Sequence, residues 1–94
     1  MCRDVIESLP LGYAFLADQL RRSSSSIVLN FAEGYGKRSP RDARRYFDTS
    51  RGSANEVAAT LDWAAVFGLL PEDTHRKALD LCDHLARMLT RFRR

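Results

Sequence analysis

Cysteine is scarce in this sequence, and its scarcity limits the classes of protein to which the chain can belong. Of the 94 residues, only Cys2 and Cys82 are cysteine. Two cysteines without framework spacing argue against a disulfide scaffold and against a zinc finger. Cys82 instead falls on an apolar helical stripe, where a small buried residue is expected. A reducing, cytoplasmic setting fits this composition best.

Long apolar runs and catalytic motifs are also missing. No run approaches the roughly 20 apolar residues that span a bilayer, and Met1 to Asp4 does not resemble a secretory signal. The chain has no P-loop, no dinucleotide-binding glycine pattern and no zinc-ligand spacing. His75 and His84 would lie on opposite sides of a regular helix. We therefore expect no enzyme activity, no cofactor, no metal site and no membrane partner.

The composition that remains is that of an ordinary globular protein. Hydrophobic residues make up 45% of the chain and charged residues 29%, a balance typical of folded rather than disordered chains. The length suits a single domain over residues 1–94. Its core would be thin, so that burying further surface in a homo-oligomer would stabilise it.

Glycine and proline divide the chain at three points, because the residue before a proline avoids the helix and a glycine commonly ends one. The longest segment between them begins with a capping serine, Ser39, and with Pro40 in its first turn. Small and apolar residues then follow at steps of four and three: Ala43, Phe47, Ser50, Ala54, Val57, Leu61 and Ala64. The sequence predicts an all-α fold, an up-down antiparallel bundle of three long helices and a short N-terminal helix, over residues 2–9, 13–33, 40–67 and 72–92.

Small residues interrupt two of these expected helices. Four consecutive serines, Ser23 to Ser26, fall in the middle of helix 13–33. Their small side chains let another helix approach closely, an interpretation that we prefer to a phosphorylated or catalytic serine. Gly52 costs about 1 kcal/mol relative to alanine inside helix 40–67. It indicates either the close approach of another helix or a surface position.

Asn30 and Glu33 neighbour each other on one face of helix 13–33. A partly buried Glu33 would need a cation, and Arg51 and Arg45 are the candidates across the hairpin. We interpret Asn30, Glu33 and Arg51 as a structural polar network that fixes the register of the two helices, in preference to a catalytic glutamate.

Basic residues cluster in the sequence although the net charge is only +3. Asp42 is the only acid within a first cluster, and the sequence between the two clusters is acidic. This asymmetry suggests a polyanion partner or head-to-tail contacts between subunits. The first cluster is either a solvated turn or an anion-binding helix N-terminus, flanked by Tyr35 and Tyr46 as stacking surfaces for bases. The clusters are Lys37, Arg38, Arg41, Arg44 and Arg45, and then Arg87, Arg91, Arg93 and Arg94.

Several of these residues form a pattern that resembles the 23S ribosomal RNA intervening-sequence family, to which the accessory variability determinant proteins of diversity-generating retroelements look related. The resemblance covers about residues 13 to 92. The most specific part is an Asn-x-Ala-Glu-Gly-x-Gly-Lys run with Arg-Gly-Ser about a dozen residues beyond it. The pattern comprises Asp18-Gln19-Leu20-Arg21-Arg22, Ser26-Ile27, the run from Asn30 to Ser39, Arg51-Gly52-Ser53 and Glu56.

The resemblance implies a helical bundle that assembles into a homopentameric barrel. In the retroelement branch it implies binding to a reverse transcriptase and to nucleic acid through a basic surface. The motif positions that match are read as structural: Asn30, Glu33, Gly34, Arg51, Gly52, Ser53 and Glu56. The candidates for nucleic-acid contact are Arg21, Arg22, Lys37, Arg38, Arg41, Arg44 and Arg45.

The chain departs from the family in its short first segment, which ends at Leu9. Either the chain is shortened or another subunit completes the bundle. We expect a non-enzymatic, oligomeric adaptor that binds RNA or DNA, or a reverse transcriptase–RNA complex. The alternative is a purely structural or protein-interaction homo-oligomer with no nucleic-acid partner.

Overall fold

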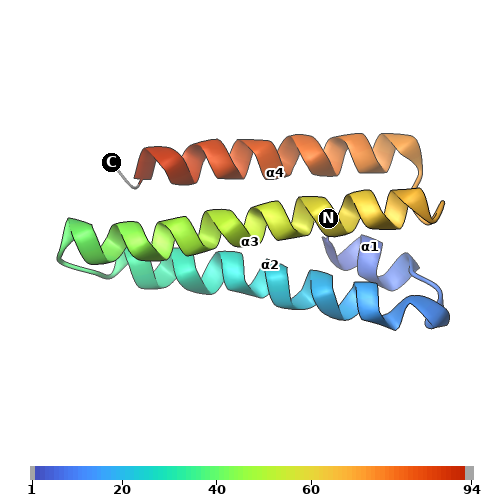
Figure 1. Ribbon diagram of the computed structural model, residues 1–94, viewed down its shortest axis with the longest axis horizontal. Coiled ribbons are helices and arrows are strands. Elements are labelled where there is room, and N and C mark those ends of the chain that lie inside the picture. Colours follow the sequence, from blue (N-terminus) through green and yellow to red (C-terminus); the bar gives the residue numbers. More distant parts are fainter. Residues whose placement is uncertain (1, 93–94) are drawn as a thin grey trace.

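The computed structural model describes residues 2–92, and the described chain is helical with no strand (Figure 1). This confirms the predicted all-α class. Each expected helix is found, with ends that differ from the prediction by no more than two residues. The elements are α1 Cys2–Ser8, the short 3₁₀ helix η1 Leu11–Tyr13, α2 Ala14–Tyr35, α3 Pro40–Val66 and α4 Glu72–Phe92.

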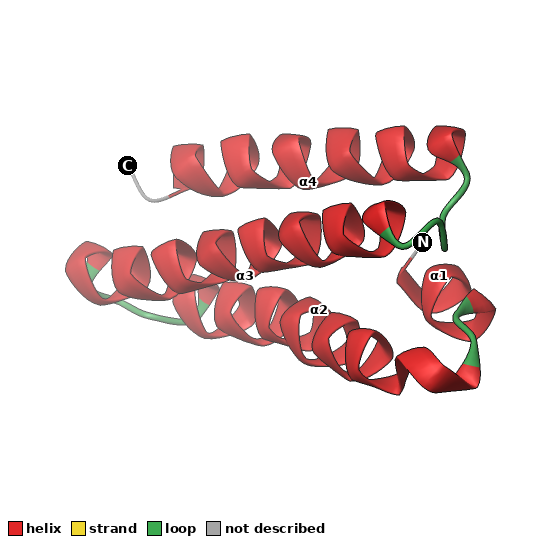
Figure 2. Cartoon of the chain, turned by 45° about the vertical axis from the view of Figure 1, so that its right-hand side comes forward, coloured by secondary structure: helices red, strands yellow, loops and turns green. Residues whose placement is uncertain are grey.

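The three long helices lie side by side, with α3 between α2 and α4 (Figure 1). They form a rod of 44 × 21 × 16 Å. One end of the rod holds the α2–α3 turn together with the end of α4, and the other holds η1 and the α3–α4 connection. Figure 2 shows α1 beside the first half of α2, near that second end.

The main core lies where α1 joins the long helices. Val5 of α1 is 3% exposed and packs in one cluster with residues of α2, α3 and α4. Because α1 has only seven residues, it covers only part of the length of the rod. The buried members of the cluster are Val5, Leu20, Val57, Leu61, Ala78 and Cys82, so the predicted burial of Cys82 is confirmed.

The α2–α3 turn begins later than predicted because α2 continues through Gly34 to Tyr35. A Cβ atom on Gly34 would lie 2.8 Å from Cε1 of Phe47 and 3.1 Å from the carbonyl oxygen of Ala43. Gly34 therefore allows α2 to pack closely against α3 instead of ending the helix. The predicted start of α3 is confirmed, since Ser39 Oγ accepts a 3.5 Å hydrogen bond from the backbone N–H of Asp42 and Pro40 occupies the first turn.

The end of α3 depends on Gly68, whose φ angle is +72°. The N–H of Gly68 donates to the carbonyl of Ala65, and the N–H of Leu69 donates to that of Ala64. These two bonds form the C-terminal motif in which a left-handed residue satisfies the last carbonyls of a helix.

Replacing Gly68 with alanine is expected to lower the free energy of unfolding by about 1 kcal/mol, because the left-handed conformation is strained for a residue with a Cβ atom. Gly52→Ala is the matched control. No atom lies within 4 Å of the added Cβ, so this change should stabilise the helix by about 0.5–1 kcal/mol. Urea unfolding measures the free energy of unfolding of both variants. Equal effects of the two changes would contradict the strained, left-handed conformation assigned to residue 68.

Candidate nucleic-acid interface

Three phenylalanines join the long helices at the end of the rod that holds the α2–α3 turn. The rings of Phe31 in α2 and Phe92 in α4 meet edge to face, with centroids 5.3 Å apart. Phe47 in α3 lies 5.7 Å from each of them. This aromatic cluster fixes the end of α4, which carries Arg91, beside the hairpin turn and the basic residues that follow it.

The charged surface around this cluster is called the basic end below. Arg87 is not part of the basic end, because it forms a 3.1 Å ion pair with Asp83 one turn earlier in α4. Arg93 and Arg94, which the sequence places in the second cluster, lie outside the described residues. The basic end consists of Lys37, Arg38, Arg41, Arg44, Arg45 and Arg91, all of them exposed.

The position of these cations in α3 opposes the usual electrostatics of a helix. Arg41 and Arg44 lie in the first turns of α3, where the backbone amides already carry a positive partial charge. Asp42 is the single acid of the first turn. Cations at this position destabilise a helix by a few tenths of a kcal/mol each. An anion bound at this end would relieve the repulsion.

Tyr35 and Tyr46 differ in how far they are available to a ligand. Lys37 Nζ and Arg45 Cζ lie 5.1 and 5.4 Å from the centroid of the Tyr46 ring, within range of cation–π attraction. Lys37 also lies 3.7 Å from the Glu33 carboxylate. Tyr35, in contrast, is 75% exposed. Only Tyr35 thus matches the expectation of an open aromatic ring beside the cations.

Arg21 and Arg22 do not belong to the basic end, which corrects the single surface expected from the sequence. At about 1.5 Å per residue, Arg22 lies about 20 Å along the helix axis from Tyr35. Arg21 pairs with Asp18 at 3.1 Å, and Arg22 donates a 3.3 Å hydrogen bond to Gln19. The seven sequence candidates therefore divide into five at the basic end and two in the middle of α2.

Asn30, Glu33 and Arg51 do not bond to one another as the sequence suggested, because the three side chains make separate contacts. Asn30 Nδ2 donates to the backbone oxygen and to Oγ of Ser26, at 2.9 and 3.0 Å. Glu33 points outward to Lys37. Arg51 donates a 3.1 Å hydrogen bond to Thr90 of α4. Phe47 occupies the space inside the hairpin, so Glu33 is not buried and needs no partner across it.

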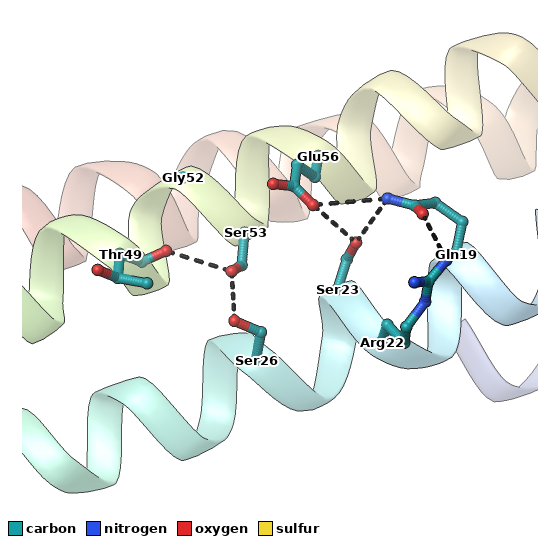
Figure 3. Close-up of a pocket in the computed structure, with 8 residues that line it drawn as sticks. All are labelled: Gln19, Arg22, Ser23, Ser26, Thr49, Gly52, Ser53 and Glu56. Atoms are coloured by element: carbon teal, nitrogen blue, oxygen red, sulfur yellow. Dashed lines mark hydrogen bonds between the residues drawn. The ribbon is translucent and has the colours of Figure 1, made fainter.

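The polar network that links α2 to α3 lies nearer the middle of the rod, as Figure 3 shows. Ser26 and Ser53 share a 2.6 Å hydrogen bond. Ser23 Oγ and Gln19 Nε2 donate to the Glu56 carboxylate at 3.3 and 3.5 Å. These groups border a shallow groove of about 530 Å³, called the α2–α3 groove below, that is lined by Gln19, Arg22, Ser23, Ser26, Thr49, Gly52, Ser53 and Glu56.

The run of serines from Ser23 to Ser26 indicated part of this arrangement, the close approach of α2 and α3. The expectation that its small side chains allow a close helix approach is confirmed by the Ser26–Ser53 bond and by a 2.7 Å bond from Ser50 Oγ to the carbonyl of Ile27. Gly52 faces open space within this chain. Six motif positions line the groove, namely Gln19, Arg22, Ser26, Gly52, Ser53 and Glu56.

Residues 2–92 offer neither a cluster of metal ligands nor a membrane span. No group of three or more potential ligands among them could hold a metal ion. No described helix has the length and apolarity to cross a membrane. His75 contacts Asp62 at 2.6 Å, which joins the start of α4 to α3, while His84 is exposed.

Comparison with known proteins agrees with the helical arrangement. The family model described as 23S rRNA-intervening sequence protein matches residues 5–91. A comparison with curated proteins gives no match. The match extends over nearly the whole chain, from α1 to the last turn of α4. The chain therefore belongs to the 23S rRNA-intervening sequence protein family.

Proposed function

We propose that this chain is a non-enzymatic adaptor that binds nucleic acid, RNA in particular, through the basic end. The observation that carries the proposal is the gathering of five exposed cations around the α2–α3 turn, with Arg91 of α4 at the same end of a narrow rod. The family name associates these proteins with a ribosomal RNA gene. RNA alone or an RNA bound to a reverse transcriptase would present the same phosphates.

The charges at this end favour a polyanion over a small anion. Arg38, Arg41 and Arg44 are exposed and spread over the turn and the first turns of α3, so one small ion cannot neutralise them all. A nucleic-acid backbone offers regularly repeated phosphates. Most of the affinity would then come from released counterions, and it would fall steeply as salt is added.

Replacing Arg38, Arg41 and Arg44 together with glutamine is expected to weaken RNA binding by about tenfold or more at low salt. The salt dependence of log K should become shallower by about 2 to 3, because about one phosphate contact is lost for each arginine. Fluorescence anisotropy with a structured RNA across a salt series measures both quantities.

The matched control removes three cations away from the basic end, by changing Arg3, Arg76 and Lys77 to glutamine. Arg3 and Arg76 pair with neighbouring acids, Glu7 and Asp73, on the surface. The control should bind nearly as well as the unchanged protein. Equal weakening by both triple variants, or no binding of RNA at low salt, would contradict the proposed function.

A second candidate function is a protein-interaction homo-oligomer without nucleic acid, for which the resemblance suggests a pentamer. Two surfaces favour it: the α2–α3 groove, and the aromatic residues at the other end of the rod. There Phe15, Trp63 and Phe67 remain between 44% and 49% exposed, and the Trp63 ring contacts each of the other two. Light scattering coupled to size exclusion distinguishes the candidates, because this function predicts an oligomer that carries no nucleic acid.

A further inference from the structure

We propose that the basic end binds unpaired nucleotides, and that one base stacks on the ring of Tyr35. This inference rests on the proposed function, since it requires nucleic acid at the basic end. It adds the form of that nucleic acid, a single strand or a loop, and the residue that recognises it.

Tyr35 is the most exposed aromatic residue at this end of the rod, since Phe92 is 46% exposed and its ring packs against Phe31 and Phe47. It is the last residue of α2, and 75% of its surface is open to solvent. Phe31, one turn earlier, lies beside it with a centroid distance of 6.3 Å and an interplanar angle of 24°. A large ring that is backed on one side and open elsewhere is the arrangement on which a nucleobase stacks.

The support beneath Tyr35 is fixed by packing. Phe31 contacts both Phe47 and Phe92. Gly34 holds this part of α2 against the Phe47 ring, with no room for a side chain of its own. Because Phe31 is already held in place, the ring that backs Tyr35 loses no further freedom when a base stacks, so more of the stacking free energy contributes to affinity.

The neighbouring charges suit the phosphates on either side of a stacked base. Lys37 and Arg38 follow Tyr35 directly after Gly36. Arg91 precedes Phe92, whose ring touches Phe31. The α2–α3 turn and the end of α4 therefore both supply cations at the end of the rod where Tyr35 lies. The Tyr46 ring lacks this freedom, because Lys37 and Arg45 lie against it.

The same geometry distinguishes a single strand from a duplex. In a duplex each base is already stacked on its neighbours, and only the phosphates are offered to the protein. The cations would bind either form, but the Tyr35 ring would gain a partner only from an unpaired base. Tyr35 should therefore contribute to single-strand affinity and add almost nothing to duplex affinity.

The test compares Tyr35→Leu, which keeps an apolar side chain without a ring, with Tyr35→Phe, which keeps the ring. Anisotropy is measured with a short single-stranded RNA, a DNA strand of the same sequence and the corresponding RNA duplex. Tyr35→Leu should weaken single-strand binding by about 5- to 100-fold, the factor that corresponds to one base–aromatic stack. Tyr35→Phe should bind like the unchanged protein, and both variants should bind the duplex normally.

A strand that carries 2-aminopurine reports stacking directly. Its fluorescence should be quenched on binding to the unchanged protein and to Tyr35→Phe, and much less on binding to Tyr35→Leu. Because Tyr35 is exposed, circular dichroism should show that both variants keep the helical fold.

The two proposals fail in different ways. If Tyr35→Leu binds the single strands as tightly as Tyr35→Phe does, or weakens single strands and duplex equally, the stacking role is wrong while nucleic-acid binding stands. If the unchanged protein binds none of the three probes at low salt, the proposed function itself is wrong.

Discussion

Replacing Leu61 with alanine is expected to lower the free energy of unfolding by about 2–5 kcal/mol. Leu61 is 1% exposed and lies in the core cluster that α1 shares with the three long helices. Removing most of its side chain leaves a cavity bordered by several helices, which cannot all close in at once. Because domains of this size are stable by only about 5–15 kcal/mol, this single change removes a large share of the stability.

Leu81→Ala deletes the same atoms at a position in α4 that is 50% exposed, and it should change stability by less than about 1 kcal/mol. Urea unfolding followed by circular dichroism compares the two variants under the same conditions. Similar losses for Leu61→Ala and Leu81→Ala would mean that the core is not centred where α1 joins the long helices.

The helices could be predicted because their apolar residues repeat with the period of the α-helix. In α3 all predicted seam residues except Ala43 are buried. The predicted seam nevertheless does not include all of the buried residues of α3, since Ser53 and Thr60 are buried as well. The central helix of three packs on two sides, and a single stripe in the sequence reports only one of them.

The role of Gly34 could not be read from the sequence. A glycine near a helix end ordinarily indicates the end itself. Here the deciding contact is with Phe47, which lies on another helix, and α2 continues past the glycine. Local spacing contains no information about a ring that approaches from a partner helix.

The candidate site, too, could be predicted from the sequence only in part. The sequence located the basic turn and Arg91, but not that they lie at the same end of the rod, which follows from α4 running antiparallel to α3 and ending beside the hairpin turn. It also placed Glu33 in a buried network. Spacing showed that Asn30 and Glu33 neighbour each other, but not that Phe31 and Gly34 take the inner side and leave Glu33 outside.

Replacing Phe47 with alanine is expected to cost about 3–5 kcal/mol. Phe47 is 5% exposed and contacts Phe31 and Phe92, so its loss opens a cavity in the cluster that holds α2, α3 and α4 together at the basic end. Urea unfolding measures the loss. A cost below about 1 kcal/mol would contradict the central place of this ring.

Gly34→Ala supplies the matching test of the contact. In the unchanged protein the added methyl group meets the Phe47 ring at 2.8 Å, an overpacking that costs about 1–3 kcal/mol. In Phe47→Ala that clash is gone, and only the 3.1 Å approach to the Ala43 carbonyl remains. The loss of unfolding free energy in the double variant should therefore be smaller than the sum of the two single losses, by about 1 kcal/mol or more. Strict additivity would show that the two residues do not contact each other.

The same pair of core variants separates the stability of the fold from the assembly of the basic end. Leu61→Ala weakens the core at the α1 end and leaves the aromatic cluster in place. Phe47→Ala removes one of the two ring contacts that hold Phe92, and with it Arg91, beside the hairpin turn, and leaves only the contact with Phe31. At temperatures where both variants are folded, Phe47→Ala should weaken RNA binding and reduce its salt dependence, whereas Leu61→Ala should bind like the unchanged protein. Equal binding by both variants would mean that the α4 cation acts independently of the turn, and that the basic end does not depend on the three-ring contact.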